Sequence, residues 1–189
     1  MWFLFQWIES LLQALGLKNK SARIVVVGLD NAGKSTLVHK LCTNEVRSFV
    51  PTTKAHNKTF TLGRIEFTAW DLGGHEQVRD LWEDFYSTAD AIVFMIDSSD
   101  TQRFSEARSE LDKILESDSL RSVPILILGN KTDLEGSEER ENIIESLNVR
   151  KFFSGEVEDD EDRPLQVFMC SLVASTGYVE GFQWLSKQL

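Results

Sequence analysis

Residues 28–36 read Gly28-Leu29-Asp30-Asn31-Ala32-Gly33-Lys34-Ser35-Thr36 and are the most informative segment of the chain. It matches the pattern glycine, four residues, glycine-lysine-serine, which binds the phosphates of a nucleotide. Gly28 and Gly33 suit backbone angles that a Cβ would forbid, so successive N–H groups can point at phosphate oxygens. Lys34 adds a positive charge near the β- and γ-phosphates, and the Ser35 hydroxyl can bind Mg²⁺. We therefore expect nucleotide contacts from Asp30, Asn31, Ala32, Gly33, Lys34, Ser35 and Thr36.

The sequence on either side of this loop fits a strand and a helix. The apolar run Ile24-Val25-Val26-Val27 precedes the loop, and residues 36–41 are compatible with a helix. A glycine turn before an ordinary helix is the alternative. Strand, loop and helix in this order favour a phosphate-binding loop instead.

The rest of the chain alternates predicted strands with predicted helices. Residues 59–62 and 65–70 alternate in polarity around Gly63-Arg64, as in a β-hairpin, whereas residues 43–58 are polar and irregular. Continuous apolar runs, typical of buried parallel strands, lie at residues 91–96, 125–128 and 165–169. Helical patterns lie at residues 104–115, 137–147 and 179–189. We predict an α/β fold with a doubly wound, mostly parallel six-stranded sheet that has one antiparallel edge strand.

The composition fits one domain with a short appendage, which we place at residues 21–189 and 1–20. The 189 residues include 30 acidic and 20 basic ones, and the formal net charge of −10 argues against nucleic acid as a partner. Cys42 and Cys170 make no disulfide framework, which fits a reducing cytosol. The acidic run at residues 156–162 is expected to be a solvated loop.

Residues 1–20 are expected to form an amphipathic helix that lies in a membrane interface. Apolar residues recur at helical spacing, and large aromatic rings lie near the start: Trp2, Phe3, Phe5 and Trp7. The lysines follow the apolar part, unlike those of a secretory signal, and the segment is too short and too polar to cross a membrane. Trp at position 2 excludes N-myristoylation. A helix packed permanently on its own domain is the alternative, and a helix that alternates between both positions would satisfy both interpretations.

A second motif, Trp70-Asp71-Leu72-Gly73-Gly74-His75, ends a predicted strand. An aspartate at a strand tip can hold Mg²⁺ through water, which is the role expected of Asp71. Gly74 can offer its backbone N–H to a γ-phosphate. The motif is weak alone and strong after a phosphate-binding loop.

A third motif, Asn130-Lys131-Thr132-Asp133, selects the base. The Asp133 carboxylate can accept hydrogen bonds from guanine N1–H and the exocyclic amino group, whereas adenine offers neither. A further contact is expected from Ser171 and Leu172, where a backbone N–H can reach guanine O6. A turn without a ligand is the alternative for the tetrapeptide in isolation. Together the motifs predict a guanine nucleotide.

These motifs in this order resemble those of Ras-superfamily small GTPases, and in detail those of the Sar type in the Arf/Sar branch. The resemblance covers nearly the whole chain and is carried by residues 28–35, 70–77, 125–131, 167–171 and 181–186. Arf proteins usually have glutamine in place of His75 and a myristoylated glycine in place of Trp2, so both differences favour the Sar type. The resemblance implies a P-loop GTPase fold, bound GTP or GDP, and Mg²⁺.

The resemblance also implies the remaining site residues. The family's switch I threonine, which completes the Mg²⁺ shell beside Ser35 and Asp71, maps to Thr52. Thr53 stays an alternative, because this sequence lacks the second Pro-Thr that Sar relatives often have shortly afterwards. His75 would orient the water that hydrolyses GTP to GDP and phosphate.

Turnover should be slow without an activating protein. No arginine is obviously placed to act in cis, and Arg79, in the predicted helix after His75, is expected to face partners or solvent. The resemblance implies that the inner coat subunit supplies the missing arginine and that a membrane-bound exchange factor loads GTP.

The implied function is a switch on the cytosolic face of the endoplasmic reticulum, with the Golgi as a second location. In the family, GTP shifts the register of the hairpin between the switches and expels the N-terminal helix. Residues 1–17 would then enter the membrane surface, and coat complex II would be recruited for transport to the Golgi. Two alternatives stay open: a non-enzymatic, GTP-dependent membrane-bending protein, and an Arf-like GTPase at another membrane.

Overall fold

The computed structural model describes residues 20–47, 49, 55–62, 65–75, 79, 82–154 and 163–189. The expected N-terminal helix at residues 1–17, both switch I candidates, Thr52 and Thr53, and the acidic run at residues 156–162 lie outside the described residues. No helix in the described part is both long and apolar enough to cross a membrane.

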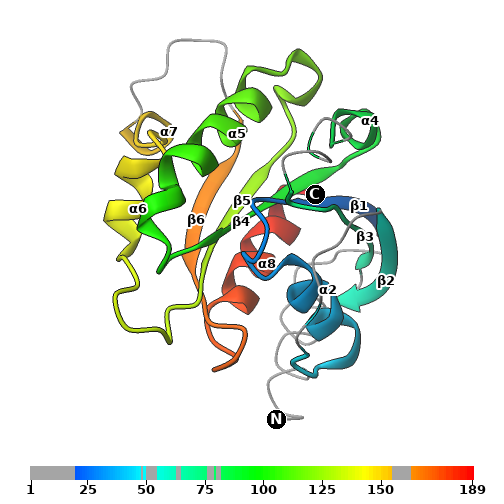
Figure 1. Ribbon diagram of the computed structural model, residues 1–189. Helices are drawn as coiled ribbons and strands as arrows, with labels where there is room; N and C mark the ends of the chain where they lie inside the picture. The colour runs from blue at the N-terminus through cyan, green and yellow to red at the C-terminus, as the bar shows by residue number, and fades with distance from the viewer. Residues whose placement is uncertain are drawn as a thin grey trace.

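A six-stranded sheet forms the centre of the molecule, in the order β2-β3-β1-β4-β5-β6 (Figure 1). Its strands are β1 (Lys20–Val27), β2 (His56–Leu62), β3 (Ile65–Asp71), β4 (Ala91–Asp97), β5 (Ile125–Asn130) and β6 (Leu165–Met169). Strand β2 pairs antiparallel with β3, and every other pairing is parallel. The predicted mostly parallel sheet with one antiparallel edge strand is confirmed.

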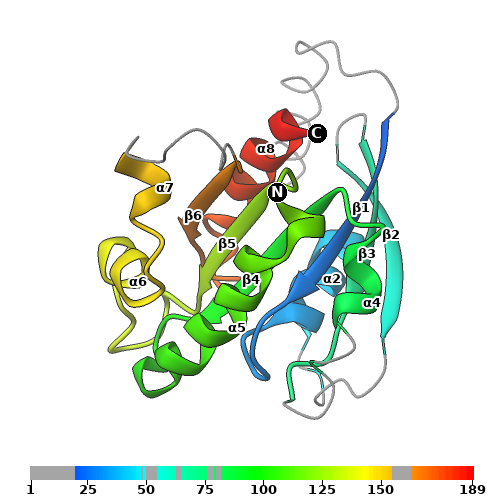
Figure 2. The same cartoon turned by 90° about the horizontal axis from the view of Figure 1, so that it is seen from above.

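Helices cover both faces of the sheet, which confirms the doubly wound arrangement. Their bounds are α2 (Lys34–Thr43), α4 (Glu83–Tyr86), α5 (Phe104–Glu116), α6 (Arg140–Ser146), α7 (Lys151–Ser154) and α8 (Tyr178–Gln188), with short 3₁₀ turns η2 (Thr101–Arg103) and η3 (Asp118–Leu120). Side chains of α2 and α8 join one buried cluster, and those of α4, α5 and α6 join the other. Figure 2 shows the strands between α5 and α8.

The burial of the strands explains their sequence patterns. Every residue of β5 is buried, as are the first six of β4, because these strands lie inside the sheet with helices on both faces. Strand β3 instead alternates buried Ile65, Phe67 and Ala69 with more exposed residues. Parallel strands place their carboxyl ends at one edge of a sheet, and the loops that follow β1, β3 and β5 carry the three motifs.

Two predicted boundaries were wrong. The helix expected at residues 137–147 begins at Arg140, because Glu139 is still extended and acts as its N-cap. The irregular stretch expected at residues 43–58 ends early, since His56, Asn57 and Lys58 already pair with the end of β3. Backbone pairing at this edge is independent of the polar side chains there, so the hydrophobic pattern could not reveal it.

Candidate nucleotide site

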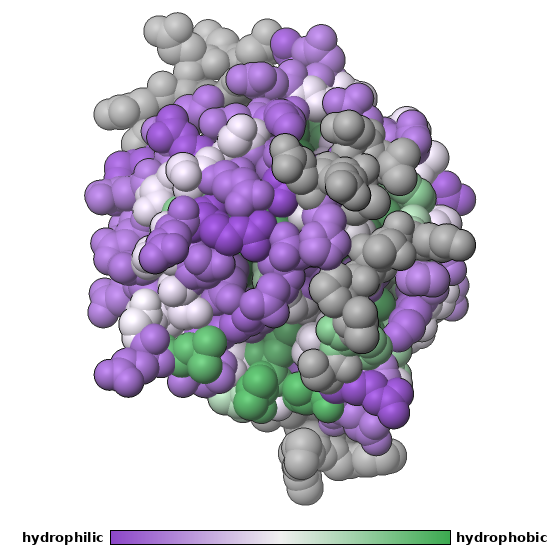
Figure 3. Space-filling model, viewed as in Figure 1, coloured by the Kyte–Doolittle hydropathy of each residue, from purple (hydrophilic) through white to green (hydrophobic). Residues whose placement is uncertain are grey.

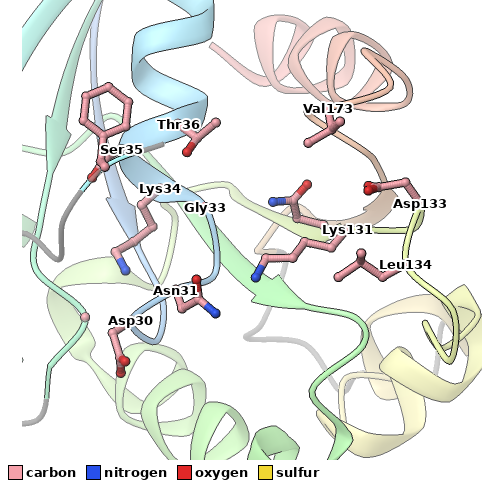
Figure 4. A pocket seen from close by; sticks show the side chains of 13 residues that line it. Asp30, Asn31, Gly33, Lys34, Ser35, Thr36, Lys131, Asp133, Leu134 and Val173 are labelled. Carbon is pink, nitrogen blue, oxygen red and sulfur yellow. The ribbon is translucent and has the colours of Figure 1, made fainter. Parts of the chain in front are cut away.

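A cavity of about 410 Å³ lies where the three motifs meet (Figure 4). Most predicted nucleotide contacts line it: Asp30, Asn31, Gly33, Lys34, Ser35, Thr36, Gly74, Asn130, Lys131 and Asp133. Figure 4 shows Lys34 and Ser35 on one side and Lys131 and Asp133 on the other. The fold thus brings together groups suited to phosphates and groups suited to a base.

The phosphate-binding loop has the backbone geometry that its glycines allow. Gly28 has φ +129°, and a Cβ there would lie 2.1 Å from the Met95 carbonyl oxygen. Gly33 has φ +102°, and Asn31 between them is also left-handed, with φ 62°. Since the chain turns sharply at these points, the loop wraps around the end of the cavity before α2 begins.

Lys34 is the positive charge of this loop. Its ammonium Nζ donates to the Leu29 carbonyl oxygen at 2.7 Å, which holds the side chain along the loop. Burial lowers the pKa of Lys34 to about 8, against the opposing effect of nearby Asp71 and Asp30. A buried ammonium group of this kind gains from an anionic ligand beside it.

Asp71 and Ser35 make a site that fits Mg²⁺. Asp71 is buried at the end of β3, and its Oδ1 has no hydrogen-bond partner among the described residues. Burial raises the pKa of Asp71, although a hydrogen bond from Ser35 opposes this. An unpaired carboxylate oxygen beside a hydroxyl oxygen is the donor set that this cation prefers. Thr52 and Thr53 cannot be placed, because both lie outside the described residues.

The base end is organised by Asn130. Its Nδ2 donates to the Ala32 carbonyl oxygen at 2.9 Å, and its Oδ1 accepts from the Leu172 N–H at 3.3 Å. Asp133 Oδ1 accepts from the Ser171 hydroxyl, which joins the third motif to the loop after β6. Ala32, Ser171 and Leu172 are themselves buried behind the cavity wall rather than part of its lining.

Lys131 is held in place by an ion pair. Its Nζ lies 2.6 Å from Asp97 Oδ2 at the end of β4. Its backbone is left-handed, with φ 69°. This arrangement leaves the aliphatic part of Lys131 on the cavity wall, where it can cover one face of a base.

Three apolar residues of the lining were missed by the sequence analysis: Phe49, Leu134 and Val173. They are three of the four large apolar side chains that are exposed in the described residues, the other being Val46. Figure 3 shows apolar residues gathered towards the lower edge of an otherwise largely hydrophilic face. Leu134 and Val173 directly follow predicted contacts, a signal that could have been used. Exposed apolar side chains at a cavity suit the flat faces of a base.

The second motif contacts the phosphate-binding loop through Gly74. A Cβ on Gly74 would lie 2.3 Å from Asp30 N and 2.5 Å from Lys34 Nζ, so only glycine fits. His75 is exposed and is not part of the cavity lining. The hydrolytic role of His75 therefore stays a prediction.

The prediction that Arg79 faces partners or solvent is wrong. Arg79 is only 6% exposed, and its guanidinium forms ion pairs with Glu106 at 2.7 Å and Glu110 at 3.3 Å. An arginine is stable at this depth only because carboxylates from α5 pair with it. That pairing leaves its guanidinium occupied within the chain.

The chain is similar to known proteins over nearly its whole length. Residues 8–189 match the model of the ADP-ribosylation factor family. The chain is 42% identical to the small COPII coat GTPase SAR1 of Giardia intestinalis, with 97% of each chain covered. It is 39% identical to SAR1B of Dictyostelium discoideum, covering 98% of this chain and 95% of the relative. Among solved structures, it resembles the Arl6 small GTPase of Trypanosoma brucei with a bound GppNp analogue: TM-score 0.78, 31% identity, and coverage of 89% and 96%.

Proposed function

Because this chain belongs to the ADP-ribosylation factor family, we propose that it is a GTP-dependent switch that recruits the COPII vesicle coat to the endoplasmic reticulum membrane. The P-loop GTPase fold and the Sar-type resemblance expected from the motifs are confirmed. The chain is a GTPase. The observation that carries the proposal is one cavity lined by both the phosphate-binding loop and Asp133, with Asp71 buried behind that lining and hydrogen-bonded to Ser35.

Each residue at the cavity has its own role in binding or hydrolysis. Lys34 and the loop N–H groups bind the β- and γ-phosphates, and the Gly74 N–H binds the γ-phosphate. Ser35 and Asp71 would hold Mg²⁺, with Thr52 as the further ligand expected from the family. The cation, when bound, neutralises charge on the phosphate oxygens. His75 orients the attacking water, and Asp133 selects guanine.

Hydrolysis is slow when the protein is alone. Arg79 is bound to Glu106 and Glu110, so it does not reach the phosphates, and an activating protein supplies an arginine worth roughly 10³ to 10⁵ in rate. We assign that role to the inner layer of the coat. A membrane-bound exchange factor loads GTP.

Membrane attachment depends on the nucleotide. Residues 1–17 lie in the interface of the cytosolic leaflet when GTP is bound, through Trp2, Phe3, Phe5 and Trp7. The protein is peripheral, on the endoplasmic reticulum and with the Golgi as the second location. With a net charge of −10, apolar insertion rather than attraction to anionic lipids supplies the binding energy.

An Arf-like GTPase at another membrane is the second candidate, because the Trypanosoma brucei neighbour is Arl6. His75 in place of the usual Arf glutamine, and Trp2 in place of an acylated glycine, favour the Sar type.

Flotation with neutral liposomes, with GDP or a non-hydrolysable GTP analogue, tests the proposal. We expect co-flotation with the analogue only, and loss of it when the four N-terminal aromatic residues are replaced by alanine. Phosphate release should accelerate when the inner coat subunit is added. Equal flotation with both nucleotides would contradict the switch.

A further inference from the structure

Two buried side chains anchor two consecutive carbonyl groups beside the cavity. The indole Nε1 of Trp82 donates to the Gly73 carbonyl oxygen at 2.9 Å. The guanidinium Nε of Arg79 donates to the Gly74 carbonyl oxygen at 2.8 Å. Trp82 is 3% exposed and Arg79 6%, so neither bond competes with bulk water. Both donors lie within seven residues of His75, the last residue of the second motif.

The geometry of the peptide bond turns these anchors into constraints on two N–H groups. The described chain has no cis peptide bond, and in a trans peptide the C=O and N–H point in opposite directions. Trp82, by holding the Gly73 carbonyl, fixes the direction of the Gly74 N–H away from the buried apolar cluster to which Trp82 belongs. Arg79 likewise fixes the peptide from which the His75 side chain starts.

The fixed direction of the N–H group matters most at Gly74. It lines the cavity and packs against the phosphate-binding loop, with room for no Cβ beside Asp30 and Lys34. A donor that is already aimed before the reaction costs no reorganisation when charge develops on the phosphate.

Arg79 is itself held rigidly. Its Nη1 and Nη2 donate to Glu110 and Glu106, so each guanidinium nitrogen has an acceptor. Glu106 also accepts from Arg103, which binds Asp30 of the phosphate-binding loop. A planar guanidinium with three acceptors has little freedom to move the carbonyl that it holds.

We propose that Arg79 and Trp82 are positioning residues for GTP hydrolysis, which together hold the Gly74 N–H towards the γ-phosphate and set the position of His75. This inference rests on the proposed function. Neither side chain touches the nucleotide. Both act through the two peptides that they anchor.

Two substitutions test the proposal. Trp82→Phe removes the indole N–H and keeps an aromatic ring. Arg79→Lys keeps the positive charge and removes the planar guanidinium with its several N–H donors. We expect each variant to lower the single-turnover hydrolysis rate by about tenfold or more, below the effect of removing an oxyanion donor outright. Affinity for a non-hydrolysable GTP analogue should fall by roughly threefold to tenfold, the loss of one modest hydrogen bond. GDP affinity should change by less than about twofold, because GDP has no γ-phosphate.

Matched controls carry the same substitutions elsewhere. Trp184→Phe alters a partly buried ring that packs on Phe168, and Arg150→Lys alters a surface ion pair with Glu145. Both should leave all three quantities unchanged. If Arg79→Lys fails to fold, Glu106→Gln removes the negative charge of the partly exposed partner and leaves a single accepting oxygen, so it should give a smaller loss of the same kind.

Two results would overturn the inference: hydrolysis within twofold of wild type in both variants, or an equal fall in affinity for GDP and the analogue, as general loosening would give. Failure of the proposed function looks different. If wild type binds guanine nucleotides without hydrolysing GTP, the ratio of analogue to GDP affinity still decides whether the anchors position Gly74.

Discussion

Arg103, the last residue of the 3₁₀ turn η2 that precedes helix α5, pairs with Asp30 of the phosphate-binding loop, although 73 positions separate them in the sequence. The Arg103 Nη2 lies 2.8 Å from Asp30 Oδ1. Burial opposes ionisation of Asp30, yet the hydrogen bond and charge of Arg103 hold its pKa below the usual value. Asp30 also lines the cavity, so its negative charge would face a nucleotide if Arg103 were absent.

Arg103→Met should therefore weaken nucleotide binding. We expect a loss of roughly threefold to tenfold for the GTP analogue, because the partly exposed pair is worth about 1 kcal/mol. The loss should shrink at high salt, which screens the repulsion between Asp30 and the phosphates. Titrations at low and high salt check this, with Arg108→Met in the neighbouring helix α5 as the control. If the loss of affinity were the same at low and high salt, its cause would not be electrostatic.

Asp133→Asn should change the preferred base. The asparagine Oδ1 can still accept from N1–H, but its Nδ2 amino group can donate to the C2 carbonyl oxygen of xanthine and faces another donor, the exocyclic amino group, in guanine. We expect GDP affinity to fall by roughly 100-fold and xanthosine diphosphate affinity to rise. Competition binding measures both. Unchanged selectivity would remove Asp133 from the base site.

Lys40→Met should speed nucleotide release without destabilising the protein. Lys40 is 3% exposed, its Nζ donates to the Ser175 hydroxyl at 2.8 Å, and within the described ranges it forms no ion pair with a carboxylate. Burial lowers its pKa. Ser175 belongs to the same loop after β6 as Ser171 and Leu172, the expected base contacts, so loss of this hydrogen bond should make that loop less rigid. The free energy of unfolding should change little, because removal of a buried charge offsets the lost hydrogen bond.

Stopped-flow GDP release, with thermal unfolding alongside, checks that prediction. We expect release to accelerate several-fold while the melting temperature falls by no more than about 3 °C. Lys187→Met, at an exposed position of α8, should change neither quantity. GDP release at the wild-type rate, together with a marked fall in melting temperature, would show that Lys40 stabilises the fold and does not affect nucleotide release.

His75→Ala should slow hydrolysis and spare binding. An exposed side chain next to Gly74 contributes little to stability, so the GDP affinity and melting temperature should match wild type. The hydrolysis rate, with and without an activating protein, should fall by about 10-fold to 100-fold, since water positioning is lost. Wild-type rates under both conditions would exclude His75 from the reaction.

Glu106→Gln should change how stability depends on pH. Hydrogen bonds from Arg103 first and Arg79 second keep the pKa of Glu106 below its usual value. A carboxyl with a lowered folded-state pKa stabilises the protein above the unfolded pKa, near 4.5, and loses that contribution as pH falls further. Wild type should therefore exceed the variant at pH 7, and the difference should shrink below about pH 4.5. Urea unfolding across this range checks it, and a constant difference would contradict the pairing.

The sequence predicted most of the sheet and the cavity because both depend on local signals. Continuous apolar runs identify β4 and β5, since those strands are buried on both faces, and the mostly apolar run of β6 identifies an edge strand whose residues alternate between buried and partly buried. The three motifs follow strand ends, and parallel topology then brings them together at one edge.

The missed features depend on distant partners. Arg79 is buried only because Glu106 and Glu110 lie 27 and 31 positions further along the chain, which no periodicity in its own segment records. Phe49 reaches the cavity while its ring packs on His39 of α2, another tertiary contact. The first residues of β2 pair through the backbone, so their polar side chains gave no sign of a strand.

Equilibrium titration of the 189-residue chain with GTP, GDP and ATP in the presence of Mg²⁺ decides whether the cavity is a guanine-nucleotide site. The cavity requires both guanine nucleotides to bind more tightly than ATP by about 10⁴-fold, because adenine would leave the Asp133 carboxylate without donors. Comparable affinity for ATP, or no nucleotide binding with Mg²⁺ present, would show that the cavity does not select guanine nucleotides.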